Sequence, residues 1–248
     1  MANPSTTGTE VTPPSVTIRW LAASPHFLDR DDKPRGGRPL ALLAYLVIER
    51  PEGASRDELM ELLWDPKPGV DASARLRNQL YELDRLLPSG ILHRAGRNVS
   101  VDSGRLECDL LALREAVAER DVEAVLRLVD ADCLNSAPPH GSAYLEEWAE
   151  GVRLRTRLSL YEFFSTVAAE GLALAPQTHL DVARRLVQLD PESVEAWATV
   201  IQAAGHAGVP AEGLDAAERI DQILAERDQT ADPALRELLS SARGTRPR

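Results

Sequence analysis

The stretch Asp71–Leu87, DASARLRNQLYELDRLL, decides how the first part of this chain folds. Its leucines recur at positions 76, 80, 83 and 87, and steps of four, three and four residues place all of them on one face of an α-helix. The opposite side and the flanks carry an amide, a phenol and three guanidinium groups: Arg75, Arg77, Asn78, Tyr81 and Arg85. Such groups read base edges and phosphates in a DNA major groove. The pattern therefore predicts a helix with a buried leucine face and an outer face that either contacts DNA or is only solvated.

Two further helices are predicted before this one. Arg38–Glu49, RPLALLAYLVIE, is apolar nearly all round, which is typical of a buried helix, and a buried strand is seldom this long. Ser55–Glu58, SRDE, is a capping box, in which each side chain accepts a hydrogen bond from a free backbone N–H at the start of a helix. That helix is expected to run to about Trp64, with leucines on its inner side at Leu59, Leu62 and Leu63.

Short β elements are predicted on both sides of the three helices. Val16–Leu21 alternates loosely and predicts a strand, whereas His26–Gly37 predicts a loop or a short hairpin turn. Ile91–Arg94 and Asn98–Val101 flank a glycine turn and predict a β-hairpin. A strand, three helices and a hairpin form a winged helix-turn-helix, in which the hairpin is the wing. The tip of the wing offers four polar side chains, three of which can reach phosphates or a minor groove: His93, Arg94, Arg97 and Asn98.

The second part of the chain is predicted to be helical. Leu110–Val129 predicts two short helices, Asp132–Ser142 a loop, and Ala143–Leu174 a long helical stretch that ends before Pro176. In LVQLDPESVEAW, residues 186–197, a turn leads to a proline at the first helical position, and small residues on both sides allow helices to pair closely. This part resembles tetratricopeptide-type helix pairs, with a further turn at Gly208.

The bulk composition points away from membranes, disulfide scaffolds and enzymes. No apolar run reaches the roughly 18 residues that a membrane span needs, and the N-terminus lacks the order of a signal peptide, so a cytoplasmic location is expected. Cys108 and Cys133 are too few for a disulfide scaffold, and no Cys or His cluster has metal-ligand spacing. No catalytic constellation, cofactor loop or metal site can be named. The histidines are expected on the surface or in loops, at His26, His93, His140, His179 and His206, and tryptophans are expected in the core, at Trp64, Trp148 and Trp197.

Charge separates the two parts of the chain. Residues 1–105 carry 14 Lys and Arg against 14 Asp and Glu, whereas residues 106–248 carry 14 against 25, a difference that equals the net charge of −11 of the whole chain. The acidic second part argues against nucleic acid there, and the neutral first part needs a local basic surface to bind DNA. Of the 28 basic residues only Lys33 and Lys67 are lysine.

The segments described above resemble those of a known protein family. Over about residues 16–102 the chain resembles the OmpR-type winged-helix domain of SARP-type bacterial transcriptional activators. The segments that carry this resemblance are RPLALLAYLVI, SRDELMELLW, ARLRNQLYELDRLL and ILHRAGRNVSV. Over about residues 107–240 the chain resembles the bacterial transcriptional activator domain that follows the winged-helix domain in these proteins. The matching pieces are Cys108-Asp109-Leu110, Glu147-Trp148 with Arg153 or Arg155, LVQLDPESVEAW and the turn at Gly208. The ATPase module of some larger SARP-type proteins is absent from this sequence.

The resemblance implies a mainly α fold with a winged-helix DNA-binding domain over 16–105 and a tetratricopeptide-like bacterial transcriptional activator domain over 106–240, between a disordered tail at 1–15 and a tail at 241–248. It implies a sequence-specific transcriptional regulator, an activator rather than an enzyme, whose helical repeats hold a second copy of the chain or RNA polymerase. The implied contacts to double-stranded DNA are Arg75, Arg77, Asn78, Tyr81 and Arg85 on the recognition helix and Arg94 and Arg97 on the wing.

One departure keeps a second interpretation open. The family usually has a basic residue near the end of the recognition helix, where this chain has Glu82 and Asp84 on either side of Leu83. Carboxylates beside the DNA face repel phosphate. The alternative is therefore a tetratricopeptide-like interaction scaffold whose winged-helix domain no longer binds DNA.

Overall fold

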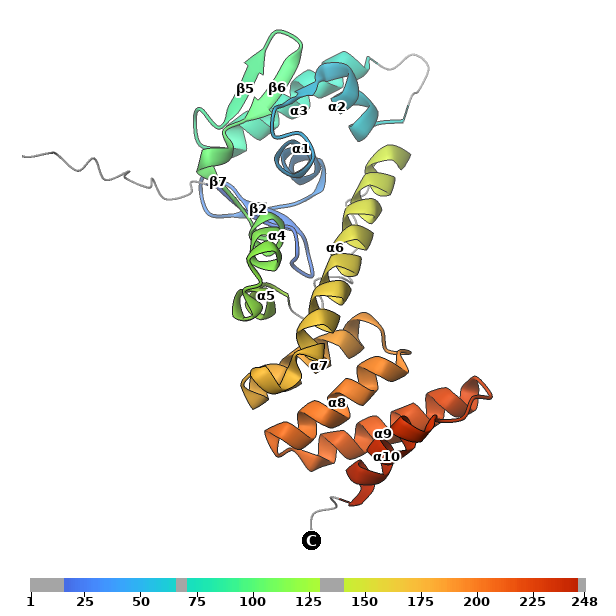
Figure 1. Ribbon diagram of the computed structural model, residues 1–248. Helices are drawn as coiled ribbons and strands as arrows, with labels where there is room; N and C mark the ends of the chain where they lie inside the picture. The colour runs from blue at the N-terminus through green and yellow to red at the C-terminus, as the bar shows by residue number, and fades with distance from the viewer. Residues whose placement is uncertain (1–15, 66–70, 130–140, 245–248) are drawn as a thin grey trace, which may run out of the picture. The chain divides into compact units, whose positions relative to one another are not determined.

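The computed structural model describes residues 16–65, 71–129 and 141–244 and divides the chain into two units (Figure 1). The first, here called the winged-helix unit, holds the described residues up to Arg114 and those from 141 to Gly151. The second, the helical-repeat unit, holds those from Glu115 to 129 and from Val152 onward. The predicted tail at 1–15 and most of the predicted loop at 132–142 lie outside the described residues.

A four-stranded sheet begins the winged-helix unit, with the strand order β3-β2-β1-β7. β1 is antiparallel to β2 and parallel to β7, and β2 and β3 form a hairpin. The hairpin lies in the stretch for which the sequence predicts either a loop or a hairpin turn, whereas β7 was not predicted. The strands are β1 (Val16–Arg19), β2 (His26–Leu28), β3 (Pro34–Arg35) and β7 (Leu106–Cys108).

Three helices and a second sheet complete the predicted winged helix-turn-helix. The helices are α1 (Gly37–Ile48), α2 (Arg56–Leu63) and α3 (Ala72–Leu86), and the second sheet has the strand order β4-β6-β5, with β4 (Ala54–Ser55), β5 (Leu92–Ala95) and β6 (Asn98–Val101). All residues of α1 from Leu40 to Ile48 are buried, so the apolar stretch is the predicted buried helix and not a strand. The Ser55 hydroxyl caps α2 by accepting the N–H of Glu58, as the capping box predicts.

The start of α6 (Ala143–Ala169) packs into the winged-helix unit. The Ser142 hydroxyl donates to the carbonyl of Leu62, and the Ala143 N–H donates to the Asp65 carboxylate at 3.1 Å. Trp148, 8% exposed, lies with its ring centroid 5.2 Å from that of Tyr45 and 5.4 Å from that of Trp20. Trp148 is therefore a core residue, as predicted, but of the winged-helix unit.

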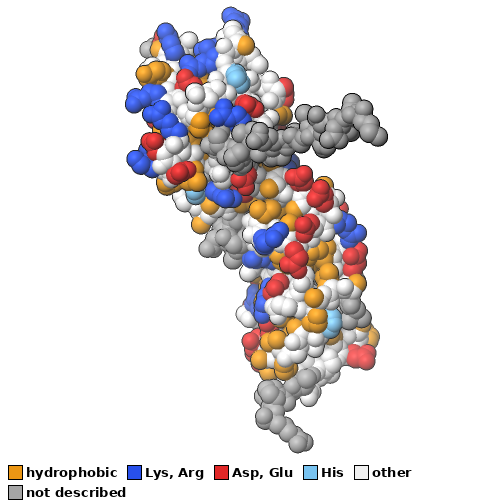
Figure 2. Space-filling model, turned by 90° about the vertical axis from the view of Figure 1, so that its left-hand side faces the viewer, with side chains coloured by type: hydrophobic (Ala, Val, Ile, Leu, Met, Phe, Trp, Pro, Cys, Tyr) orange, Lys and Arg blue, Asp and Glu red, His pale blue; other side chains and the backbone are white. Residues whose placement is uncertain are grey.

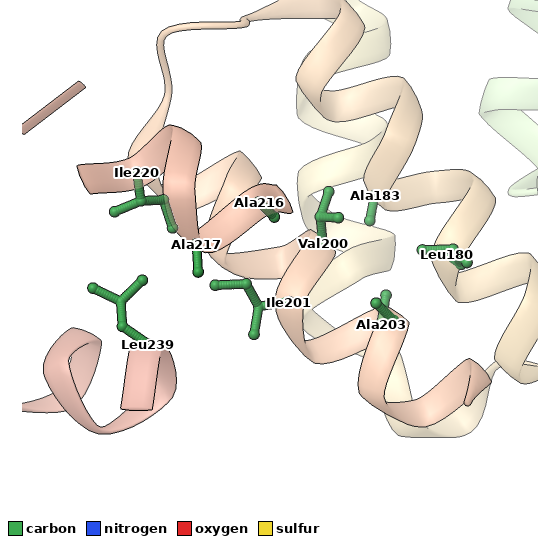
Figure 3. Close-up of a cluster of buried hydrophobic side chains, with 10 residues drawn as sticks. Leu180, Ala183, Val200, Ile201, Ala203, Ala216, Ala217, Ile220 and Leu239 are labelled. Atoms are coloured by element: carbon green, nitrogen blue, oxygen red, sulfur yellow. The ribbon is translucent and has the colours of Figure 1, made fainter. Parts of the chain in front are cut away.

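Helices make up the helical-repeat unit and bury small side chains between them (Figure 3). Ala183 from α7, Ala203 and Ala204 from α8, and Ala216 and Ala217 from α9 are fully buried beside Leu180, Val200 and Ile220. Small residues allow the helices to approach closely, which is the predicted tetratricopeptide-like packing. The helices are α4 (Asp109–Glu119) and α6, which are shared with the winged-helix unit, and α5 (Val122–Leu128), α7 (Pro176–Leu189), α8 (Val194–Ala207), α9 (Pro210–Glu226) and α10 (Pro233–Gly244).

Several predicted details of the helical part change. The break before Pro176 is confirmed, since α7 begins there, but α6 ends at Ala169 and a short 3-10 turn, η2 (Gly171–Ala173), replaces the rest of the predicted stretch. α10 continues to Gly244, into the segment expected as a tail. Trp197 is half-buried and packs against the buried cluster of the helical-repeat unit, while its indole N–H donates to the Pro191 carbonyl at 2.8 Å. Trp64, at the end of α2, is half-buried and not fully buried in the core. Among the described helices, none is long and apolar enough to cross a bilayer.

Candidate nucleic-acid interface

The leucine face of α3 is buried and its outer face is open. Leu76, Leu80, Leu83 and Leu87 are between 0% and 2% exposed, as the four-three-four spacing predicts. The five residues predicted on the outside are all exposed: Arg75, Arg77, Asn78, Tyr81 and Arg85. Tyr81 is 61% exposed, an unusual position for a tyrosine in a helix that has an apolar face to bury it. The sequence pattern therefore placed this face correctly.

The two ends of α3 are fixed by polar contacts. The Asp71 carboxylate caps the first turn by accepting the N–H of Ala74 at 2.9 Å. At the other end, the carbonyl of Leu86 accepts the N–H of Arg30 from the β2–β3 hairpin at 2.8 Å. Asp29 organises this hairpin: hydrogen bonds from the Lys33 and Asp31 N–H groups and from Arg35 lower its pKa to about 2. This support was not predicted from the sequence, although residues 29–32, DRDD, are a turn signal.

One outer guanidinium group is held against an aromatic ring. The Cζ atom of Arg75 lies 5.4 Å from the centroid of the Trp64 ring, at the end of α2. This cation–π contact leaves the guanidinium edge free to donate. Arg75 therefore lies on the α2 side of α3.

Arg77, Asn78 and Arg85 lie toward solvent. By helical periodicity Asn78 and Arg85 are at the pole opposite the leucines, and Arg77 is on the flank between them and the leucine face. Within residues 16–65, 71–129 and 141–244, the side chains of Arg77 and Arg85 have no hydrogen bond or ion pair. The outer face thus carries an amide and two guanidinium groups that are available to a ligand.

The wing is a tight hairpin with Arg97 at its turn. Ala95 pairs with Asn98, so Gly96 and Arg97 form a two-residue turn in which Gly96 has φ +60°. Left-handed backbone of this kind favours glycine. Arg56 at the start of α2 braces the turn, since its N–H donates to the Arg97 carbonyl at 2.9 Å and its Nε to the Gly96 carbonyl at 3.3 Å. The Arg97 side chain is exposed.

Arg94 differs from the other predicted wing contact. Its Nη2 lies 2.5 Å from Oδ2 of Asp84 on α3, with the two side chains 33% and 46% exposed. From the sequence, Arg94 was predicted to contact phosphate and Asp84 to repel it. The structure brings them together as an ion pair, so neither charge stands alone. Glu82 accepts from the Gln79 amide at 3.2 Å.

Figure 2 shows Lys and Arg side chains gathered on the surface of the winged-helix unit, where acidic side chains lie among them. The winged-helix unit thus has local clusters of basic side chains, although Lys and Arg are balanced by Asp and Glu over residues 1–105.

The histidines do not form a site among the described residues. His26, His93 and His206 are not buried, as predicted, whereas His179 is 3% exposed, so the prediction for His179 was wrong. His140 lies outside the described residues. In the described part of the chain, no group of three or more His, Cys, Asp or Glu side chains could hold a metal ion. Cys108 is buried, and burial raises the pKa of its thiol to about 11.

Comparison with known proteins gives a match in fold. Mycobacterium tuberculosis EmbR, solved in complex with a low-affinity phosphopeptide, superimposes with a TM-score of 0.52 and 20% sequence identity over 94% of this chain and 66% of the EmbR chain. The chain has the winged-helix plus helical-repeat fold of EmbR. It spans about two thirds of the length of that structure, and at this identity the likeness concerns the fold. Neither a protein-family model nor a curated protein matches the chain.

Proposed function

We propose that this chain is a SARP-type transcriptional regulator that binds double-stranded DNA. The observation that carries the proposal is the outer face of α3, on which exposed amide and guanidinium groups lie opposite four buried leucines, next to a β-hairpin wing. The fold of EmbR, a SARP-family regulator, supports it. The phosphopeptide is a ligand in the EmbR structure, and we do not propose that this chain binds one.

In the proposed complex α3 enters the major groove and the wing lies on the neighbouring backbone. Asn78 and Arg85, at the outer pole, face the base edges, where an amide pairs with adenine and a guanidinium with guanine. Arg77, Tyr81 and Arg75 contact the sugar-phosphate on either side of the groove. Arg97, at the turn of the wing, contacts phosphate or the minor groove.

The helical-repeat unit is proposed to hold a partner, either a second copy of the chain or RNA polymerase, so that activation follows from DNA binding in the cytoplasm. A single winged-helix unit with few free arginines binds DNA weakly, and linking two such units raises the effective affinity. Analytical ultracentrifugation on target DNA tests the dimer: one chain per site at saturation contradicts it.

Salt-dependent binding to generic duplex DNA tests the proposal as a whole. Each phosphate contact contributes about −0.9 to the slope of log affinity against log salt. The double variant Arg85→Ala with Arg97→Ala is expected to weaken binding and to reduce the magnitude of this slope by about 0.9, because Arg97 is the proposed phosphate contact of the two and Arg85 is proposed to face the bases. The measurement is fluorescence anisotropy of a labelled duplex between about 50 and 200 mM salt.

The matched control removes two guanidinium groups from the helical-repeat unit, Arg185→Ala with Arg236→Ala. Among the residues that the structure describes, the side chains of both bond within their own helical segment, to Gln188 and to the Asp232 carbonyl. This control is expected to leave the slope unchanged. If the wild-type chain shows no salt-dependent binding, the scaffold interpretation replaces the proposal. If it binds but the Arg85 and Arg97 variant behaves as wild type, a different face is used.

A further inference from the structure

The ion pair between Asp84 and Arg94 joins the proposed recognition helix to the wing. Along β5, Leu92 and Arg94 lie on the same face of the strand because successive side chains alternate. Leu92 is 8% exposed, and the β6 residues opposite the pair, Val101 and Val99, are 6% and 0% exposed. The strand therefore directs Arg94 toward the interior side of the wing, and its guanidinium reaches over α3 to the Asp84 carboxylate at 2.5 Å.

His93 and Ala95 lie on the opposite face of β5 by the same alternation, and both are exposed. Arg97 is separate again, because it occupies the turn and has no side-chain partner among the described residues. Two arginines of one hairpin thus have different environments: Arg97 projects at the turn, whereas Arg94 spans the gap between wing and helix.

On the α3 side, Asp84 lies on the same flank of the helix as Arg77, two turns away. A carboxylate on this flank with no partner would repel the phosphates that Arg77 is proposed to contact. The Arg94 guanidinium neutralises that charge without adding a net positive charge to the face.

From this geometry we infer that Arg94 and Asp84 are positioning residues, which hold the wing against α3 and do not contact DNA. The inference rests on the proposed function and corrects the set of contacts that the family resemblance implies. The set is reduced to Arg75, Arg77, Asn78, Tyr81, Arg85 and Arg97.

A double-mutant cycle separates positioning from phosphate contact, because the two roles predict opposite effects of Asp84→Ala on the affinity for DNA. The variants are Asp84→Ala, Arg94→Ala, the double variant, and the charge swap of Asp84→Arg with Arg94→Asp. Affinity and salt slope are measured on a mixed-sequence duplex of about three helical turns. If the pair positions the wing, each single variant binds DNA about two- to fivefold more weakly, with the wild-type salt slope. The double variant then binds no more weakly than either single variant, and the charge swap recovers affinity.

A phosphate contact predicts the reverse. Arg94→Ala would then reduce the magnitude of the slope by about 0.9, and Asp84→Ala would tighten binding by removing repulsion. Either result overturns the inference. Glu61→Ala is the matched control, since it removes an exposed carboxylate from α2 and reports the long-range gain from one less negative charge.

Amide hydrogen exchange of β5 and β6 in the free, full-length chain supplies a readout that needs no DNA. Asp84→Ala and Arg94→Ala are both expected to accelerate exchange in the wing to the same extent, whereas Glu61→Ala is not. If the wild-type chain does not bind DNA, the proposed function is wrong. If the two variants leave exchange in the wing unchanged, the inference about the ion pair is wrong, whatever the result with DNA. The two failures are therefore distinguishable.

Discussion

At the scale of single residues, His179 stands out because its imidazole is buried without a hydrogen-bond partner. It is 3% exposed, and neither ring nitrogen has a partner among the described residues. An ideal Cβ at Gly171 would lie 2.8 Å from its Cε1 atom, so the ring fills the space that glycine leaves. The ring of His206 lies at its edge, with 6.0 Å between centroids. Burial and the neighbouring His206 lower the pKa of His179 below its usual 6.5.

This environment predicts that the helical-repeat unit loses stability in acid. His179 takes up a proton in the unfolded chain as the pH falls through 6.5, and in the folded chain only at lower pH. Above pH 6.5 the titration of His179 therefore does not change the free energy of unfolding. As the pH falls from 6.5 to the lower pKa of the folded chain, protonation of the unfolded chain reduces that free energy. His179→Leu is expected to flatten the dependence of the melting temperature between about pH 7.5 and 5.5. His93→Gln, an exposed control in the winged-helix unit, should leave the dependence as it is. An unchanged profile for His179→Leu would contradict the account.

The periodicity of α7 held a signal for this burial. His179 shares the spacing of the buried residues Val182, Ala183 and Leu186, three, four and seven positions later. The Asp84–Arg94 pair carried no such signal, because it depends on the register of a hairpin and on which face of β5 meets α3. Periodicity within one element was readable from the sequence, whereas side-chain partners on different elements were not.

At the scale of elements, the wing depends on a glycine outside the hairpin itself. Gly53 has φ +100°, and an ideal Cβ there would lie 2.6 Å from the Asn98 amide nitrogen and 2.9 Å from the Val99 carbonyl oxygen. Gly53 thus allows the backbone before β4 to pass close to β6. The sequence indicates a turn at this glycine but not its contact with a strand that lies more than forty residues later.

Gly53→Ala is expected to destabilise the winged-helix unit by about 1–3 kcal/mol, because the positive φ is strained for alanine and the Val99 backbone cannot yield as a side chain does. Urea unfolding followed by circular dichroism measures the loss. Gly36→Ala is the control: its nearest atom is 3.5 Å away, at ordinary contact distance, and its φ of −112° suits any residue. Equal stability of the two variants would show that the close approach is unimportant.

At the scale of the whole molecule, chain order and structural units differ. The sequence resemblance places the boundary between domains near residue 105, whereas the winged-helix unit also includes the start of α6 up to Gly151. The tryptophan of the Glu147-Trp148 motif is one reason, since its ring packs on Tyr45 and its indole N–H reaches the Glu49 carboxylate at 3.3 Å. The Tyr45 hydroxyl, in turn, donates to Glu58 at 2.6 Å, and burial together with this contact raises its pKa.

Trp148→Ala is therefore expected to destabilise the winged-helix unit, by about 3–5 kcal/mol as for other buried aromatic truncations. Hydrogen exchange of the α1 amides in the full chain reports the unit that is affected. Tyr144→Phe provides the comparison, since it removes only the hydroxyl that lies 3.3 Å from that of Tyr45 and should cost about 1 kcal/mol or less. If Trp148→Ala accelerates exchange only in α7–α9, the tryptophan stabilises the helical-repeat unit and the prediction is wrong.

The shared helix has a consequence for how such proteins are recombined, in evolution or in the laboratory. A gene fusion that joined the first 114 residues to a foreign domain would leave Trp20 and Tyr45 without the indole that covers them. Exchange of the helical-repeat unit therefore needs two junctions, one within α4 near Arg114 and one within α6 downstream of Gly151, and at each the donor must continue the same helix. Chimaeras that respect both junctions are expected to remain folded, and those cut after Arg114 alone are expected to aggregate.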